Sequence, residues 1–219
     1  MTRSRALSAL LCAAILLLAA PTHARAAEGA WRGDDAAGDA VAFTFSPEPP
    51  PCGSVSERTA PRGDIRRLGV RHTRSSVRVT VVISDLDAGP ARVSVPLQTE
   101  RRHIDLDIDL PTGPEADGVE GSLSDPGKPT RPELDECGGY GWISFGVSCE
   151  ALRVRAAAHA VTATIPRSCL GHPRWVRAGA EVQTELPDEE WTSDRWAPAA
   201  ADDTPWWRPV LGPRVRAAR

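Results

Sequence analysis

The chain has 219 residues and a formal net charge of −3 at pH 7, with 41% apolar and 25% charged residues. This length suits one domain, or one domain with tails. Because the charge is slightly negative and the arginines are dispersed, the composition excludes a typical nucleic-acid binder, which needs clustered positive charge. Beyond the N-terminus there is no long apolar run, so a protein with several membrane-spanning helices is excluded as well.

Residues 1–26 have the pattern of a secretion signal. Two arginines precede an apolar run over 6–20, and Ala24-Arg25-Ala26 is a small-residue cleavage site. Cys12 lies inside the apolar run and not at its end, which argues against a lipid anchor. We therefore expect a secreted protein that begins at Ala27 and has no membrane span after cleavage.

The cysteines predict two disulfides. Of the five cysteines, Cys12 is removed with the signal, which leaves Cys52, Cys137, Cys149 and Cys169. Four cysteines in an exported chain usually form two bonds. Cys149 and Cys169 flank an expected hairpin, which brings them close together, and this leaves Cys52 for Cys137. The alternative is a zinc site with four thiolates, but the sequence lacks the closely spaced cysteine pairs that such a site uses.

Alternating apolar and polar residues predict a β domain over 40–183. The clearest strand is 76–84, where valines and an isoleucine face one way and polar side chains face the other. A slip in the alternation within 65–72 predicts a β-bulge. The remaining strands are expected at 40–45, 91–98, 103–110, 142–145, 151–157, 160–165 and 174–183, and a tight turn or short helix at 166–171.

Three segments differ from these strands in composition. Residues 27–39 are small, acidic and glycine-rich, which predicts a flexible lead-in. Residues 111–141 lose the alternation and are rich in Pro, Gly and acids, as in a long functional loop or a disordered segment. Residues 184–219 contain four tryptophans. Because tryptophan side chains are costly to leave in water, we expect this tail to dock partly on the domain.

The fold class that follows is all-β. Short strands separated by frequent turn signals are typical of an antiparallel β-sandwich, immunoglobulin-like or jelly-roll-like. The sequence contains neither an internal repeat nor a clear amphipathic helix, and we expect a single, monomeric domain.

Four segments carry a resemblance to known proteins: Gly63–His72, Val77–Leu86, Thr164–Arg177 and Leu211–Arg216. They resemble a group of uncharacterised secreted proteins of actinobacteria. The most specific part of this resemblance is the motif Pro-Arg-x-Cys-Leu-Gly, which begins at Pro166 within the third segment. This resemblance implies export and a β fold. The layout of the strands is also similar to that of DOMON and family-9 carbohydrate-binding sandwiches, a likeness of pattern from which no ligand residue is carried over.

One candidate metal site lies on a predicted strand. Asp105, Asp107 and Asp109 share one face of this strand because alternate residues point the same way. Two such carboxylates with loop carbonyls can bind Ca²⁺, a hard cation that prefers oxygen ligands. The alternative is an acidic face whose charge is balanced by Arg92 or Arg78 on neighbouring strands. No cofactor other than calcium is expected.

The candidate ligand-binding residues are aromatic: Tyr140, Trp142 and Trp175, together with the tryptophans of the tail. Aromatic side chains present flat apolar faces on which the apolar faces of sugar rings can stack. The alternative is that these side chains fill the core or dock the tail, and only their exposure decides between the two.

The expected function is non-enzymatic binding of a cell-wall or other extracellular polysaccharide, or of a protein. One alternative is a secreted hydrolase that uses loop carboxylates: Asp117, Glu120, Asp125, Glu133, Asp135 and Glu136. Glycoside hydrolysis needs two carboxylates in a fixed geometry, and the motifs G-x-S-x-G and H-E-x-x-H are absent. No catalytic residue is therefore assigned. A second alternative is a structural protein of the cell envelope.

Overall fold

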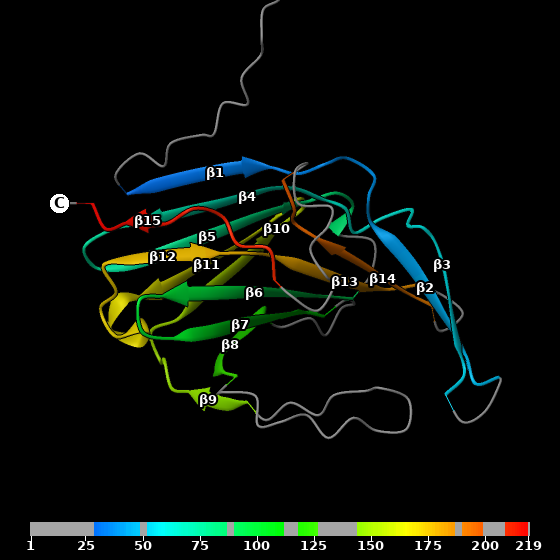
Figure 1. Ribbon diagram of the computed structural model, residues 1–219. Coiled ribbons are helices and arrows are strands. Elements are labelled where there is room, and N and C mark those ends of the chain that lie inside the picture. Colours follow the sequence, from blue (N-terminus) through cyan, green and yellow to red (C-terminus); the bar gives the residue numbers. More distant parts are fainter. Residues whose placement is uncertain are drawn as a thin grey trace, which may run out of the picture.

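The computed structural model describes residues 29–48, 52–86, 90–111, 118–126, 144–186, 190–198 and 209–218. Across these residues the chain consists mostly of β-strands, which form two antiparallel sheets (Figure 1). The prediction of an all-β fold with antiparallel sheets is confirmed. The predicted signal over 1–26 lies outside the described residues.

The smaller sheet has five strands in the order β1-β4-β5-β11-β10. Their bounds are β1 (Ala30–Asp34), β4 (Ile65–His72), β5 (Ser76–Ile83), β11 (Ala160–Pro166) and β10 (Arg153–Ala157).

The larger sheet has ten strands, and its main path runs β3-β2-β14-β13-β6-β7-β8-β9. Off this path, β12 pairs with both β6 and β15. Their bounds are β2 (Val41–Ser46), β3 (Ser54–Thr59), β6 (Ala91–Thr99), β7 (His103–Leu110), β8 (Glu120–Asp125), β9 (Phe145–Val147), β12 (Trp175–Ala178), β13 (Glu181–Glu185), β14 (Trp191–Arg195) and β15 (Val215–Arg216).

Alternation explains why the central segments form strands that face a common core. In β5 the side chains of Val77, Val79 and Val81 are buried, whereas Arg78 is exposed. β6 and β7 repeat this pattern in the larger sheet, and the buried residues of both sheets form one hydrophobic cluster. Burial of each large aliphatic side chain contributes about 1.5–3 kcal/mol. This cluster therefore stabilises the packing of the two sheets.

Several local predictions are confirmed. The slip in the alternation of β4 is an irregular register between Ile65 and Arg67, as a bulge requires. β10 and β11 form the predicted hairpin around Ala158 and His159. The predicted turn or short helix is the 3₁₀ helix η2 (Arg167–Leu170).

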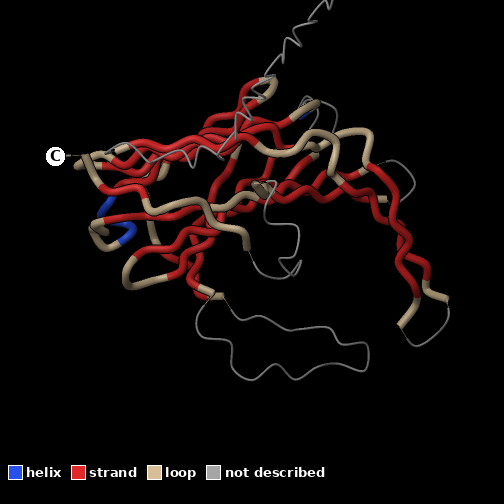
Figure 2. Tube along the Cα trace, turned by 45° about the horizontal axis from the view of Figure 1, so that its top comes forward, coloured by secondary structure: helices blue, strands red, loops and turns tan. Residues whose placement is uncertain are grey.

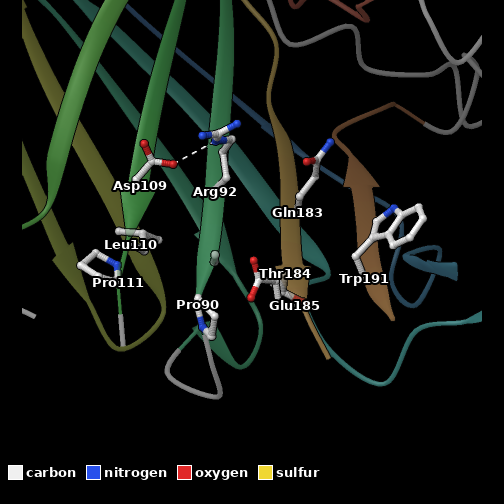
Figure 3. A pocket seen from close by; sticks show the side chains of 10 residues that line it. Pro90, Arg92, Asp109, Leu110, Pro111, Gln183, Thr184, Glu185 and Trp191 are labelled. Carbon is white, nitrogen blue, oxygen red and sulfur yellow. Dashed lines mark hydrogen bonds and ion pairs between the residues drawn. The ribbon is translucent and has the colours of Figure 1, made fainter. Parts of the chain in front are cut away.

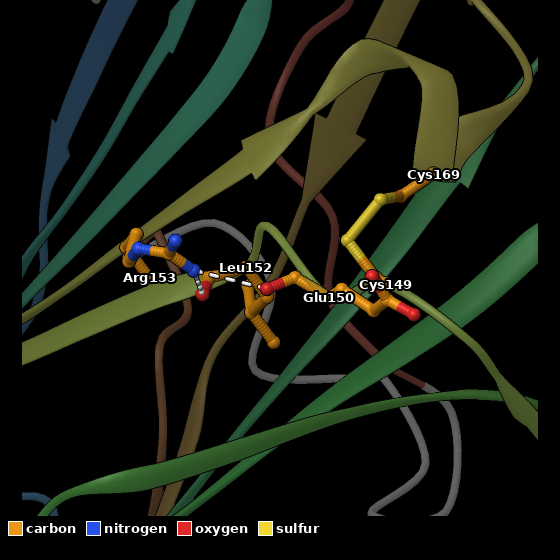
Figure 4. Close-up of a disulfide and its surroundings, with 5 residues drawn as sticks. All are labelled: Cys149, Glu150, Leu152, Arg153 and Cys169. Atoms are coloured by element: carbon orange, nitrogen blue, oxygen red, sulfur yellow. Dashed lines mark hydrogen bonds between the residues drawn. A yellow bond between two sulfur atoms is a disulfide. The ribbon is translucent and has the colours of Figure 1, made fainter.

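One of the two predicted disulfides is confirmed (Figure 4). Cys149, which precedes β10, bonds to Cys169 in η2, and their Cα atoms are 5.6 Å apart. Cys52 is disulfide-bonded as well. Cys137 lies outside the described residues, so the Cys52–Cys137 pairing stays a prediction.

The lead-in predicted over 27–39 needs a correction. Residues 30–34 form β1, which pairs with β4 at the edge of the smaller sheet (Figure 1). Trp31 on β1 packs edge-on against Trp196, with ring centroids 5.2 Å apart. The sequence does not reveal this strand because its alternate positions are only half-buried and its packing partner is remote in the chain.

The segment 111–141, in which no strand is predicted, contains β8, which pairs with β7. Leu123 is the buried residue of β8, and one buried position is too few to show alternation. The same reason applies to β3, which is exposed along its whole length. β9 begins at Phe145, where the expected strand over 142–145 ends.

The strand predicted over 174–183 is divided into β12 and β13, which pair with β6 in one continuous register. The division lies opposite Pro96, which has no N–H to donate to the ladder. The Gly179 N–H donates to the Pro96 carbonyl at 3.0 Å. A side chain at Gly179 is excluded, because its Cβ would lie 2.3 Å from the Val210 carbonyl oxygen.

The tail predicted over 184–219 contributes two strands to the larger sheet. β14 lies between β13 and β2, with Thr192 and Asp194 buried, and β15 pairs with β12. This part of the chain therefore contacts the domain by strand pairing. The hairpin of β2 and β3 forms one edge of the larger sheet and projects beyond the other strands (Figures 1 and 2).

Candidate functional site

A pocket of about 410 Å³ lies where β6 and β14 begin and where β7 and β13 end (Figure 3). Arg92, Asp109, Gln183, Glu185 and Trp191 contribute to its lining. The pocket thus combines an indole ring with charged and amide groups.

The register of the strands brings these side chains to one face of the sheet. Arg92 on β6 pairs with Asp109 on β7 and with Gln183 on β13. Glu185 on β13 pairs with Trp191 on β14. The chain neighbours of these residues within the strands are buried, so the alternation of the strand turns the five side chains outward.

The charged pair in the pocket is open to solvent. Arg92 Nε donates a hydrogen bond to Asp109 Oδ1 at 2.9 Å, and the two side chains are 58% and 60% exposed. This hydrogen bond and the charge of Asp109 raise the pKa of Arg92. An exposed pair contributes little to stability. The further N–H groups of Arg92 and the lone pairs of Asp109 are suited to hydrogen-bond a polar ligand.

The indole of Trp191 supplies an apolar surface beside these polar groups. It stacks on Phe43 of β2, with ring centroids 6.0 Å apart and an angle of 20° between the ring planes. Trp191 nevertheless remains 36% exposed. A ring that is packed on one side and open on another can contact the flat apolar face of a ligand.

Comparisons with protein-family models, with curated proteins and with solved structures found no match. Within the described ranges, no helix is both long enough and apolar enough to cross a membrane.

Of the predicted ligand-binding aromatics, Trp175 is the one that the structure describes. It lies half-buried on β12, and the guanidinium carbon of Arg214 is 4.4 Å from its ring centroid. This cation–π contact covers one face of the ring. Trp175 does not line the pocket, and Tyr140 and Trp142 lie outside the described residues.

The sequence includes Trp191 among the tail tryptophans of the predicted stacking surface but does not single it out, because it places this residue in the tail. A signal for a strand at 191–195 was available in the sequence, because outward and inward positions alternate along it. The outward residues are Trp191, Ser193 and Arg195, and the inward ones are Thr192 and Asp194. The inward positions of this strand are polar, so the pattern does not resemble that of a core strand.

Asp105, Asp107 and Asp109 share the outer face of β7. Asp109 pairs with Arg92, and Asp107 Oδ1 accepts a hydrogen bond from Ser94 Oγ at 2.7 Å. Burial, followed by the charge of Asp107, raises the pKa of Asp105 to about 6. Two of the three aspartates therefore have partners within the protein.

A different group of carboxylates, the acidic cluster, is brought together by the fold. It consists of Asp35, Asp39 and Asp194, whose carboxylate oxygens lie within 4.8 Å of one another. Burial, reinforced by neighbouring carboxylates, raises the pKa values of Asp35 and Asp194 to about 7. Because like charges repel, such a cluster is stabilised by a shared proton or by a cation.

Proposed function

We propose that this is a secreted protein that binds a polysaccharide without chemically changing it, through the pocket beside Trp191. The observation that carries the proposal is the exposed Trp191 ring, which lines the same pocket as the solvent-open Arg92–Asp109 pair and the Gln183 amide. Sugars have apolar faces that stack on aromatic rings and hydroxyl groups that donate and accept hydrogen bonds. The lining of the pocket is complementary to both properties.

The charge on this face of the larger sheet favours a neutral or amino-sugar polymer. The outward positions of β6, β7, β13 and β14 carry Asp105, Asp107, Asp109, Glu181 and Glu185 against Arg92 and Arg195. This excess of carboxylates repels an anionic polymer and attracts a cationic one. A neutral ligand is indifferent to it and relies on stacking and hydrogen bonds.

The pocket favours binding over hydrolysis. Carboxyl groups with strongly raised pKa values are typical of acid–base sites, but Asp35 and Asp194 do not line the pocket. Two carboxylates do line it: Asp109, which is paired with Arg92 in the open, and Glu185, which is exposed at the end of β13. A paired, solvated carboxylate is suited to bind hydroxyl groups and is poorly suited to transfer protons.

The proposal includes export and a sandwich architecture. The Cys149–Cys169 bond is compatible with an extracellular location, because disulfides persist in oxidising compartments. We accordingly assign residues 1–26 as the secretion signal and relate the chain to the secreted actinobacterial family. The two sheets would then form an immunoglobulin-like or jelly-roll-like sandwich.

The test is a depletion assay with the exported protein on insoluble polysaccharides and cell walls. We expect saturable binding by the wild type and about tenfold weaker binding by Trp191→Ala, because one aromatic stacking contact contributes about 1.5 kcal/mol. Trp175→Ala is the matched control. Its ring lies outside the pocket, so its affinity should equal that of the wild type.

Two results would contradict this proposal. The wild type could remain in solution with every glycan, or Trp191→Ala could bind as tightly as the wild type while having the same melting temperature. Retention only on wall material that loses its capacity after protease treatment would identify a protein ligand instead.

A further inference from the structure

We infer that a polysaccharide bound in the pocket continues along the β2–β3 hairpin, so that the protein binds several consecutive sugar units. This inference rests on the proposed function and adds a second binding surface for the same ligand. The surface is an aromatic row formed by Trp191, Phe43 and Phe45, and the aliphatic side chain of Val55 extends it at its outer end.

Strand pairing makes the aromatic row continuous. Trp191, at the pocket, pairs with Phe43 on β2. Phe45 lies two residues further along β2, so it points to the same side about 7 Å away. Val55 on β3 lies directly opposite Phe45. The row therefore begins at the pocket and follows the hairpin that projects from the sheets (Figures 1 and 2).

The outer part of the row is exposed to solvent. Phe45 is 53% and Val55 is 55% exposed, and both belong to the most exposed large apolar side chains of the described chain. Contiguous apolar surface of this kind is typical of binding sites. The row is narrow, with Glu57 opposite Phe43 at its margin. A narrow row suits a linear polymer, whereas a globular partner buries a broad surface.

The ring of Phe45 is supported by the backbone at Gly53. Gly53 has a φ of +66°, and a Cβ added there would lie 2.9 Å from Cζ of Phe45. Glycine adopts this backbone conformation readily and leaves the space that the ring occupies. A ring that is already supported loses little conformational freedom when a ligand stacks on it.

Glu190 fixes the hairpin relative to the pocket. It is the chain neighbour of Trp191, and its carboxylate accepts hydrogen bonds from Thr44 Oγ1 at 2.8 Å and from Arg58. Thr44 is on the side of β2 opposite to Phe43 and Phe45, because successive residues of a strand alternate. These contacts hold β2 and β3 against the start of β14 and leave the aromatic row open.

The experiment measures affinity as a function of ligand length. Glucose-based and N-acetylglucosamine-based oligosaccharides, from the disaccharide upward, are titrated into the exported protein by calorimetry. We expect the affinity of the wild type to rise with length and then level off once the ligand spans the pocket and Phe45. Phe45→Ala should lose about tenfold in affinity for the long ligands and keep its affinity for the disaccharide.

Two further variants serve as controls. Phe45→Tyr keeps an aromatic ring and should retain the gain with length. Phe145→Ala removes another exposed ring, 64% exposed on β9 and outside the row, and should behave as the wild type. Unchanged melting temperatures would show that the variants fold.

The outcomes separate the inference from the proposed function. If the affinity does not depend on length, or if Phe45→Ala binds long ligands like the wild type, the inference is wrong and the pocket proposal stands. If no oligosaccharide binds to the wild type, both are wrong. A concentration-dependent dimer that Phe45→Ala abolishes would show that a second copy of the chain covers the row, which also overturns the inference.

Discussion

His72 on β4 is fully buried and connects the smaller sheet to the C-terminal strand. Its Nδ1 donates to the Val215 carbonyl at 3.0 Å, which assigns the proton of the neutral ring to Nδ1. Nε2 is buried without a hydrogen-bond partner among the described residues. Burial lowers the pKa of His72, because a charged imidazolium is unfavourable in an apolar environment.

We expect His72 to make the protein less stable in acid. Its folded pKa lies below the ordinary value of 6.5, so the unfolded state binds the additional proton. The contribution to stability is complete above pH 6.5 and is lost as the pH falls through the lowered folded value. His72→Gln keeps an N–H donor for Val215 and should show a flatter melting-temperature profile from about pH 7 to about pH 5. Parallel profiles of the variant and the wild type would contradict this role.

Several elements meet at the acidic cluster. Asp194 on β14 accepts hydrogen bonds from the N–H groups of Ile65, at the start of β4, and of Arg195. Asp35 follows β1, and its Oδ1 accepts from the Ala197 N–H at 2.8 Å. The backbone contacts thus fix carboxylates from β1 and β14 close together, although their charges repel.

We expect Asp35→Asn to stabilise the protein, increasingly so at higher pH. The pKa of Asp35 is raised from 3.8 in the unfolded chain to about 7 in the folded protein. The stability that this carboxyl group contributes is therefore complete below pH 3.8 and is lost as the pH rises through about 7, whereas an asparagine loses nothing over this range. The asparagine keeps an acceptor for Ala197, and its amide NH₂ group replaces Oδ2, which is buried and has no hydrogen-bond partner within the described ranges.

The melting-temperature difference between Asp35→Asn and the wild type should therefore widen from about pH 4 to about pH 7 and stay constant above it. Asp34→Asn is the control, because Asp34 is 74% exposed and lies outside the cluster. A difference that does not change with pH would show that Asp35 is ionised in the folded protein throughout.

On the scale of the whole molecule, two connections join distant parts of the chain. The Cys149–Cys169 bond joins the segment between β9 and β10 to η2, which follows β11, and so connects the ends of the two sheets. At the opposite ends of the described chain, the Gly29 N–H donates to the Arg216 carbonyl at 3.1 Å. Both contacts restrict the separation of the sheets.

We expect Cys149→Ser to lower the free energy of unfolding by about 2–4 kcal/mol, as the loss of a disulfide with a loop of this length predicts. The loop closed by the bond has a sequence separation of 20 residues. Denaturant unfolding measures the change. Cys169→Ser and the double variant should be destabilised equally, because each removes the same bond. A much larger loss in the double variant than in either single variant would contradict this account.

Local patterns in the sequence were enough to predict the all-β class, the bulge in β4, the β10–β11 hairpin, η2 and the Cys149–Cys169 pair. These features depend on residues that are close in the chain, where alternation, turn residues and cysteine spacing are visible. β1, β3 and β8 were not visible, because each has too few buried apolar positions to show a period.

The residues of the pocket, the aromatic row and the acidic cluster could not be predicted from the sequence, because they come together only in the folded chain. The pocket requires the register of β6 with β7 and β13, and it requires β14 to insert between β13 and β2. Strand order and register follow from the packing of both sheets on one core, and a local pattern contains no information about which remote strand lies alongside. For this reason the sequence singled out Trp175, whereas the fold brings Trp191 into one pocket with Arg92 and Gln183.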